Sequence, residues 1–275
     1  MTTAFVTGAT GFIGRHLCAA LRARQVTVQE HRSEAGDVRD AAAIRHAIER
    51  ANPDCVFHLA ADVRRSAPLR EMLETNVAGT MNVLDAAQGR PLIAVGSFEE
   101  YGDCPAPFRE DMVPRPATPY GISKAMASLL VSASSGVVIR LPVVYGPGQS
   151  AKSFLGAACH ALRSRTRFAM TFGKQTRDFL YVADAVSALV MVAHEFEACC
   201  GEILNACTGV PVTLLEATQL IGGDNFADIG AIPYRPNEQM HYFGDCTKID
   251  RLTGWKAAIP FDEGIRRTLS GNVER

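Results

Sequence analysis

Tyr120 and Lys124 have the residue types and the spacing that proton transfer needs. If residues 120–134 form a helix, the four-residue step places the phenol and the ammonium on one face, one turn apart. A phenol exchanges its proton poorly near neutrality because its pKa is ~10, but an adjacent cation stabilises the phenolate and lowers that pKa. Tyr120 is therefore a candidate acid/base, and Lys124 is the residue that tunes it. The alternative is a surface helix whose lysine reaches solvent, so the surrounding chain must decide.

The composition is that of an ordinary globular protein. Of 275 residues, 47% are hydrophobic and 21% are charged, and the net charge is −1, so we expect neither nucleic acid nor an anionic membrane as a partner. No stretch reaches the ~18 apolar residues of a membrane span, and Met1 leads straight into a strand without a basic leader. The 8 cysteines are scattered without C-x-x-C spacing, which predicts no metal site and favours the reducing cytoplasm.

The start of the chain carries the strongest local signal. An apolar strand over residues 4–7 precedes glycines at G-x-x-G-x-x-G spacing, and a helical pattern follows over residues 15–24. Unpaired N–H groups at a helix N-terminus attract anions, and this order of elements is typical of a pyrophosphate site. The first glycine permits the turn, the second lets the ligand approach and the third lets the helix pack closely. The predicted dinucleotide loop comprises Gly8, Thr10, Gly11, Phe12, Ile13 and Gly14.

The end of the second predicted strand, residues 26–29, should lie beside the adenine ribose. There Glu30 could accept a hydrogen bond from a ribose 2′-hydroxyl, whereas Arg32 with Ser33 could hold a 2′-phosphate. All of them could also be solvated loop residues. We favour Arg32 and Ser33, hence NADP over NAD, and we expect Asp37 and Val38 to meet the adenine edge.

Strands and helices alternate through the first half of the chain. Strands over residues 4–7, 26–29, 54–61, 92–97 and 136–141 alternate with helices over 15–24, 41–50, 71–88 and 120–134. This pattern predicts an α/β fold with a doubly wound parallel sheet, a Rossmann domain, whose ligands bind at the carboxyl ends of the strands. Leu59, Ala60 and Ala61 fall at one such end and leave room for a cofactor. We expect residues 1–148 to form this domain and 149–275 a smaller substrate lobe, with a helix over 184–194 packing back on the first.

Several motifs occur in order along nearly the whole chain: Thr7–Gly14, His58–Ala61, Thr75–Thr80, Tyr101–Asp103, Pro119–Lys124, Tyr145–Gly148 and Arg177–Val182. In these motifs the chain resembles the extended short-chain dehydrogenase/reductases, the family of nucleotide-sugar epimerases, dehydratases and reductases. The resemblance implies that Ser97 hydrogen-bonds the reacting sugar oxygen, that Tyr120 passes a proton to or from that oxygen, and that Lys124 binds the nicotinamide ribose. Considered apart from the resemblance, Ser97 could be a serine at a strand end whose hydroxyl only hydrogen-bonds nearby backbone groups.

Residues after Ser97 distinguish the subclasses of the resembled family. Glu99 occupies the position of the base that removes a sugar proton in the 4,6-dehydratases, although it could also be a solvated turn carboxylate. Phe98 stands where those enzymes carry an acid, which argues against full dehydration. Arg177 and Arg235 match arginines that clamp the nucleotide diphosphate, or they could form surface ion pairs. Val143 replaces an asparagine that contacts the diphosphate in many members.

The resemblance favours an NADPH-dependent reductase that acts on the 4-keto group of a nucleotide-linked 4-keto-6-deoxyhexose. The nearest alternative is a 4-epimerase that keeps NAD bound and uses the same serine, tyrosine and lysine. A remote alternative is a regulator that binds the dinucleotide without turnover. The resemblance also implies a homodimer through the helices over 71–88 and 120–134, whose apolar faces could equally belong to the core.

Overall fold

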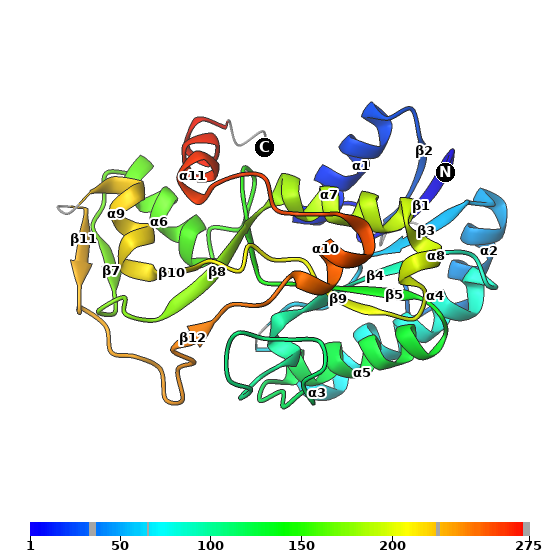
Figure 1. Ribbon diagram of the computed structural model, residues 1–275, viewed down its shortest axis with the longest axis horizontal. Coiled ribbons are helices and arrows are strands. Elements are labelled where there is room, and N and C mark those ends of the chain that lie inside the picture. The colour runs from blue at the N-terminus through cyan, green and yellow to red at the C-terminus, as the bar shows by residue number, and fades with distance from the viewer. Residues whose placement is uncertain (33–36, 65, 224–225, 272–275) are drawn as a thin grey trace.

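The computed structural model describes residues 1–32, 37–64, 66–223 and 226–271, and its larger lobe is built on a parallel sheet (Figure 1). The sheet is 6-stranded, with the order β2-β1-β3-β4-β5-β9 and parallel pairing throughout. Its strands are β1 Thr3–Thr7, β2 Thr27–His31, β3 Cys55–His58, β4 Leu92–Ser97, β5 Val137–Leu141 and β9 Ile203–Asn205. The order reverses between β1 and β3, which is where a ligand crevice forms in such sheets. The predicted fold class is confirmed.

Helices cover both faces of the sheet, as the alternation of strand side chains requires. Val6 and Phe57 pack against α1 (Phe12–Ala23) and α7 (Val182–His194), whereas their neighbours Phe5 and Val56 pack on the other face. That other face is covered by α2 (Ala41–Ala51), α4 (Gly79–Ala87) and α5 (Pro119–Ala133). Figure 1 shows α1 and α7 on one side of the strands and α4 and α5 on the opposite side.

The helix predicted over residues 71–88 is present and unbroken over residues 69–87, but its middle is a π-helical turn. It consists of α3 (Leu69–Leu73), a π-helical turn η2 (Glu74–Ala78) and α4. Asn76, which is buried in η2, hydrogen-bonds outside the helix to the backbone of Asp62 and to the side chain of Ser123. A π-helical turn inside a helix commonly marks a functional position.

The helix that carries Tyr120 begins where its local sequence directs. Thr118 is the N-cap, and its hydroxyl accepts a hydrogen bond of 3.0 Å from the amide of Gly121. Pro119 occupies the first helical position, where its missing N–H costs nothing. The turn η3 (Phe98–Glu100) precedes this region directly after β4.

The smaller lobe has its own core of aliphatic and aromatic side chains. Its elements are β6 Val143–Tyr145, α6 Phe154–Arg163, β7 Phe168–Met170, β8 Thr176–Tyr181, β10 Pro211–Thr213, α9 Leu214–Gly222, β11 Ala227–Ile229, β12 His241–Tyr242 and α11 Phe261–Ser270. Strand β8 pairs with β6, β10 and β12.

The chain returns to the sheet lobe after it has entered the smaller lobe. Helix α7, the short helix α8 (Phe196–Cys199) and strand β9 join the sheet lobe in that order. Helix α10 (Thr247–Thr253) joins it later, and Ile249 and Trp255 belong to the same core. We therefore keep the division near residue 148 as a proposal, with residues 182–206 and 247–257 assigned to the sheet lobe. Within the described residues, no helix combines the length and the apolar character that crossing a membrane requires.

Candidate active site

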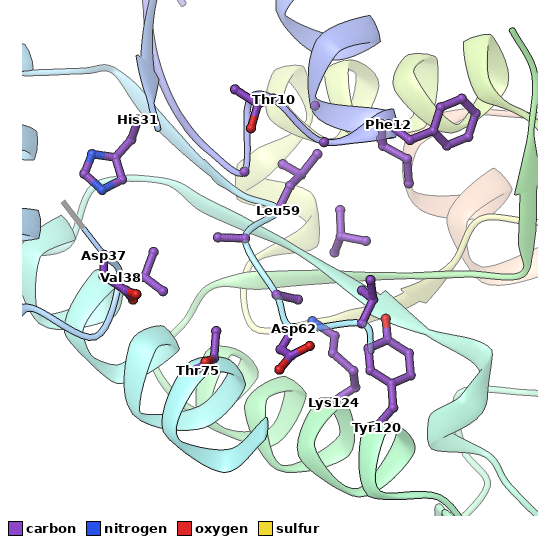
Figure 2. Close-up of a pocket in the computed structure, with 18 residues that line it drawn as sticks. Thr10, Phe12, His31, Asp37, Val38, Leu59, Asp62, Thr75, Tyr120 and Lys124 are labelled. Atoms are coloured by element: carbon purple, nitrogen blue, oxygen red, sulfur yellow. The ribbon is translucent and has the colours of Figure 1, made fainter. Parts of the chain in front are cut away.

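A cavity of about 600 Å³ opens at the carboxyl ends of β1, β3 and β4 (Figure 2). Of the residues predicted from the sequence, those that line it are Gly8, Thr10, Gly11, Phe12, Ile13, Gly14, Asp37, Val38, Leu59, Ala60, Ala61, Tyr120 and Lys124. Lining residues that the sequence analysis did not name as site residues are His31, Asp62, Val63, Thr75 and Val95. The glycine loop and the Tyr120–Lys124 pair therefore share one cavity, although more than 100 residues of chain separate them.

The glycines at the mouth of this cavity are required by close backbone contacts. Gly8 has φ +67°, and a Cβ there would lie 2.6 Å from the amide nitrogen of Ala60. A Cβ on Gly14 would lie 2.1 Å from the carbonyl oxygen of Gly8. Helix α1 begins after Gly11, and no side chain caps its first N–H groups. Those groups are therefore available to an anion such as a pyrophosphate.

Tyr120 and Lys124 extend from α5 toward the cavity, one helical turn apart (Figure 2). Lys124 is only 7% exposed, and burial lowers the pKa of its ammonium, while the charge of Glu100 acts in the opposite direction. A cation held in such a site acts on a neighbouring phenol with little screening by water. That Lys124 lowers the pKa of Tyr120 remains a prediction.

Ser97 ends β4 and starts the turn η3, beside the helix that carries Tyr120. Its hydroxyl accepts a bond of 3.2 Å from the amide of Glu99, and its own amide donates to Glu100 over 2.7 Å. A Cβ on Gly121 would lie 2.4 Å from the carbonyl oxygen of Glu99, so η3 directly contacts α5. Ser97 and Glu99 do not line the cavity themselves. Their place in the reaction therefore stays a prediction.

Two side chains of η3 have partners that bear on the chemistry. The carboxylate of Glu99 accepts a hydrogen bond of 2.9 Å from the hydroxyl of Thr118. Phe98 is fully buried and packs edge-on against Tyr101 and Phe108. The position next to Ser97 is therefore part of an aromatic core, and it cannot supply an acid.

The end of β2 presents His31 to the cavity, with Glu30 and Arg32 on either side in sequence. The Glu30 carboxylate accepts bonds from Arg32 (2.8 Å) and Arg22 (2.6 Å), and these two guanidinium groups lower the pKa of its carboxyl. Arg32 itself is 55% exposed at the strand end. Ser33 lies outside the described residues, so the predicted pair is represented only by Arg32.

Neither arginine predicted to clamp a diphosphate lines the cavity. Arg177 donates to the carbonyl oxygens of Thr176 (2.8 Å) and Gln239 (2.9 Å) and forms an ion pair with Glu238. Arg235 is exposed in the loop before β12. The diphosphate role of both residues stays a prediction, and for Arg177 it requires that a phosphate displace Glu238.

Sequence reasoning missed two buried polar clusters around the cavity. Glu100 and Arg140 form an ion pair of 2.7 Å with side chains 0% and 2% exposed. Glu100 also accepts the hydrogen bond from the amide of Ser97. His58 is buried between Thr7 and Thr80. The available signal was a charged or polar residue inside an apolar strand, because such residues are rarely buried without a partner.

Comparisons with known proteins point to one family. A model of the NAD dependent epimerase/dehydratase family matches residues 4–207. The chain is 28% identical to the GDP-6-deoxy-D-mannose reductase of Pseudomonas aeruginosa, over 97% of this chain and 95% of the relative. It is also 28% identical to the dTDP-D-glucose 4,6-dehydratase of Bos taurus, over 96% and 86% of the two chains. The solved structure of RMD from Pseudomonas aeruginosa complexed with NADPH superposes with a TM-score of 0.85 at 26% identity, covering 98% of each chain.

Proposed function

Because the chain belongs to the NAD-dependent epimerase/dehydratase family, we propose that it uses NADPH to reduce the 4-keto group of a nucleotide-linked 4-keto-6-deoxyhexose. The observation that carries the proposal is the shared cavity, in which a glycine loop suited to a dinucleotide meets Tyr120 and Lys124. The relatives include a reductase of a GDP-linked deoxyhexose and a structure complexed with NADPH, which supports NAD(P) as the cofactor class.

The residues of the cavity fit a dinucleotide. The uncapped start of α1 would hold the pyrophosphate, and the contacts at Gly8 and Gly14 keep the loop free of side chains. Lys124 would bind the nicotinamide ribose, and small residues at the end of β3 leave space beside it. When bound, the cofactor supplies the hydride for the reduction.

The chain's own residues would complete the reduction by moving one proton. As the carbonyl oxygen of the sugar gains negative charge, Tyr120 donates its phenolic proton to that oxygen. The Lys124 cation stabilises the phenolate that remains. Ser97, at the adjacent strand end, donates a hydrogen bond to the same oxygen and stabilises its developing charge.

One feature supports NADPH over NAD, and another supports reduction over dehydration. The carboxylate of Glu30 already pairs with Arg22 and Arg32, and a 2′-phosphate would replace that carboxylate as the partner of Arg32, whose side chain is 55% exposed at the strand end. Phe98 is buried among aromatic rings, so the position next to Ser97 cannot act as the acid of a water elimination. This argues against a dehydratase although dehydratases are among the relatives.

The test uses purified protein, NADPH and a panel of nucleotide-linked 4-keto-6-deoxyhexoses. A reductase consumes NADPH in proportion to the sugar reduced, which absorbance of NADPH reports. A 4-epimerase, which would use the same side chains, instead interconverts two nucleotide sugars without added cofactor. A protein that binds NADPH but turns over neither class of sugar would be the non-catalytic regulator.

Tyr120→Phe tests the assignment of the proton donor. Turnover should fall about 10²-fold or more, because general acid catalysis is lost, while NADPH binding is retained. Tyr145→Phe is the matched control, since it removes a tyrosine hydroxyl that donates to the carbonyl of Phe261 in the core of the smaller lobe. If Tyr120→Phe reduces the sugar as fast as the control does, Tyr120 is not the donor.

A further inference from the structure

His58 lies at the centre of a buried chain of hydrogen bonds that reaches from the glycine loop to η2. Its Nδ1 is 2.8 Å from the hydroxyl of Thr7, and its Nε2 is 3.0 Å from the hydroxyl of Thr80. The Thr80 hydroxyl in turn donates to the carbonyl oxygen of Asn76 over 2.6 Å, and the amide of Ala60 donates to Thr7 over 3.2 Å. All of these side chains are buried within the sheet lobe.

The bonding partners fix the tautomer of the imidazole. Thr80 has a single hydroxyl proton, and the Asn76 carbonyl can only accept, so Thr80 must accept from Nε2–H of His58. Nδ1 then carries the lone pair and accepts from the hydroxyl of Thr7. A neutral imidazole protonated at Nε2 therefore satisfies every group in the chain. Burial and the nearby charge of Lys124 favour this form, because they lower the pKa of His58 to about 3.

Each end of the chain of bonds holds an element that lines the cavity. Thr7 directly precedes Gly8, and Gly8 contacts the backbone of Ala60. At the other end η2 contributes Thr75 to the cavity wall. The side chain of Asn76 continues to Ser123, whose hydroxyl donates to the carbonyl oxygen of Tyr120 over 2.8 Å. The imidazole thus spans the space between the loop that would receive the pyrophosphate and the helices that flank the nicotinamide side.

We propose that His58 is a positioning residue, whose neutral imidazole, held between Thr7 and Thr80, fixes the glycine loop and η2 at the separation that the cofactor requires. This rests on the proposed function only in assigning the cavity to the dinucleotide. The hydroxyl of Thr80 is the sharpest point at which to test it, because Thr80→Val keeps the side-chain shape and removes the acceptor of the imidazole N–H.

The chain offers a closely matched control for Thr80. The hydroxyl of Thr218 donates to the carbonyl four residues earlier, Leu214, over 2.8 Å, as that of Thr80 does to Asn76 over 2.6 Å. Thr218 is 1% exposed and Thr80 is 2% exposed, but Thr218 lies in α9 of the smaller lobe. Thr218→Val therefore removes a similar hydrogen bond at a residue that has no hydrogen bond to His58.

The dissociation constant for NADPH, from fluorescence titration, and the melting temperature are measured for each variant. Thr80→Val should weaken NADPH binding about tenfold, because the imidazole N–H loses its partner, whereas Thr80→Ser and Thr218→Val should stay within about twofold of wild type. Thr7→Val removes the hydroxyl at the Nδ1 side of His58 and should weaken NADPH binding as Thr80→Val does. It replaces Thr80→Val in the test if Thr80→Val does not fold. Equal dissociation constants for the valine variants at positions 80 and 218 would overturn the proposal. Since no sugar is needed, a protein that binds NADPH but reduces nothing would refute only the proposed reaction.

Discussion

Removing either member of the Glu100–Arg140 ion pair should destabilise the protein far more than removing both. The side chains are 0% and 2% exposed, and the pair is joined at 2.7 Å. The Glu100 carboxylate also accepts a hydrogen bond from the amide of Ser97. The Arg140 guanidinium lies 4.5 Å from the centre of the Tyr101 ring. Removing one partner leaves a charge that water cannot reach, at a cost of about 3–5 kcal/mol. Against a usual stability of about 5–15 kcal/mol, that is a large fraction.

A double-mutant cycle measures this coupling. Arg140→Met leaves the carboxylate unpaired, Glu100→Gln leaves the guanidinium with a neutral partner, and the double variant leaves no charge. The sum of the two single losses should exceed the loss in the double variant by about 3 kcal/mol or more, and each single loss should exceed the double loss. Urea unfolding of each variant, followed by circular dichroism, gives the four free energies of unfolding.

An exposed ion pair supplies the control for this cycle. Arg70 and Glu74 lie 3.4 Å apart with side chains 91% and 52% exposed, so Arg70→Met should leave the urea midpoint nearly unchanged. The reasoning is refuted if the losses of the two single variants simply add, or if each costs less than about 1 kcal/mol.

Two further predictions concern His58 and the surface of α5. Because the pKa of His58 is about 3 in the folded protein and ~6.5 when unfolded, stability is lost as the pH falls below ~6.5, by ~1.4 kcal/mol per unit. The free energy of unfolding of the wild type minus that of His58→Gln should therefore fall by ~2 kcal/mol between pH 7 and pH 5, as measured by urea unfolding. A difference that stays constant with pH would contradict this. Met81, Met126 and Leu129 are 48%, 43% and 60% exposed on α4 and α5, so Leu129→Glu should convert the proposed homodimer to a monomer in light scattering. Leu220→Glu, at a residue 50% exposed on α9, should leave it dimeric, and a monomeric wild type would refute the dimer.

Local sequence determined the parts of the site that depend on a few neighbouring residues. Gly8 and Gly14 predicted a close turn between a strand and a helix, and the turn is present with contacts that no side chain would allow. The spacing of Tyr120 and Lys124 placed both on one helical face, because a helix repeats every 3.6 residues whatever surrounds it. Alternating apolar strands and helices predicted the parallel sheet, since that pattern can bury its strands only between layers of helices.

Tertiary structure alone decided the contacts between residues distant in the chain. Nothing local to His58 predicts that it joins Thr7 to Thr80, because the three residues meet only when β1, β3 and the helical segment beside them have packed. Nothing local to Arg177 predicts its ion pair with Glu238 either. Propensity and periodicity act over a few residues, whereas the partner of a buried polar group depends on how whole elements pack. The sequence therefore predicted the chemistry of the site, and the packing of the folded chain determined which buried polar groups surround it.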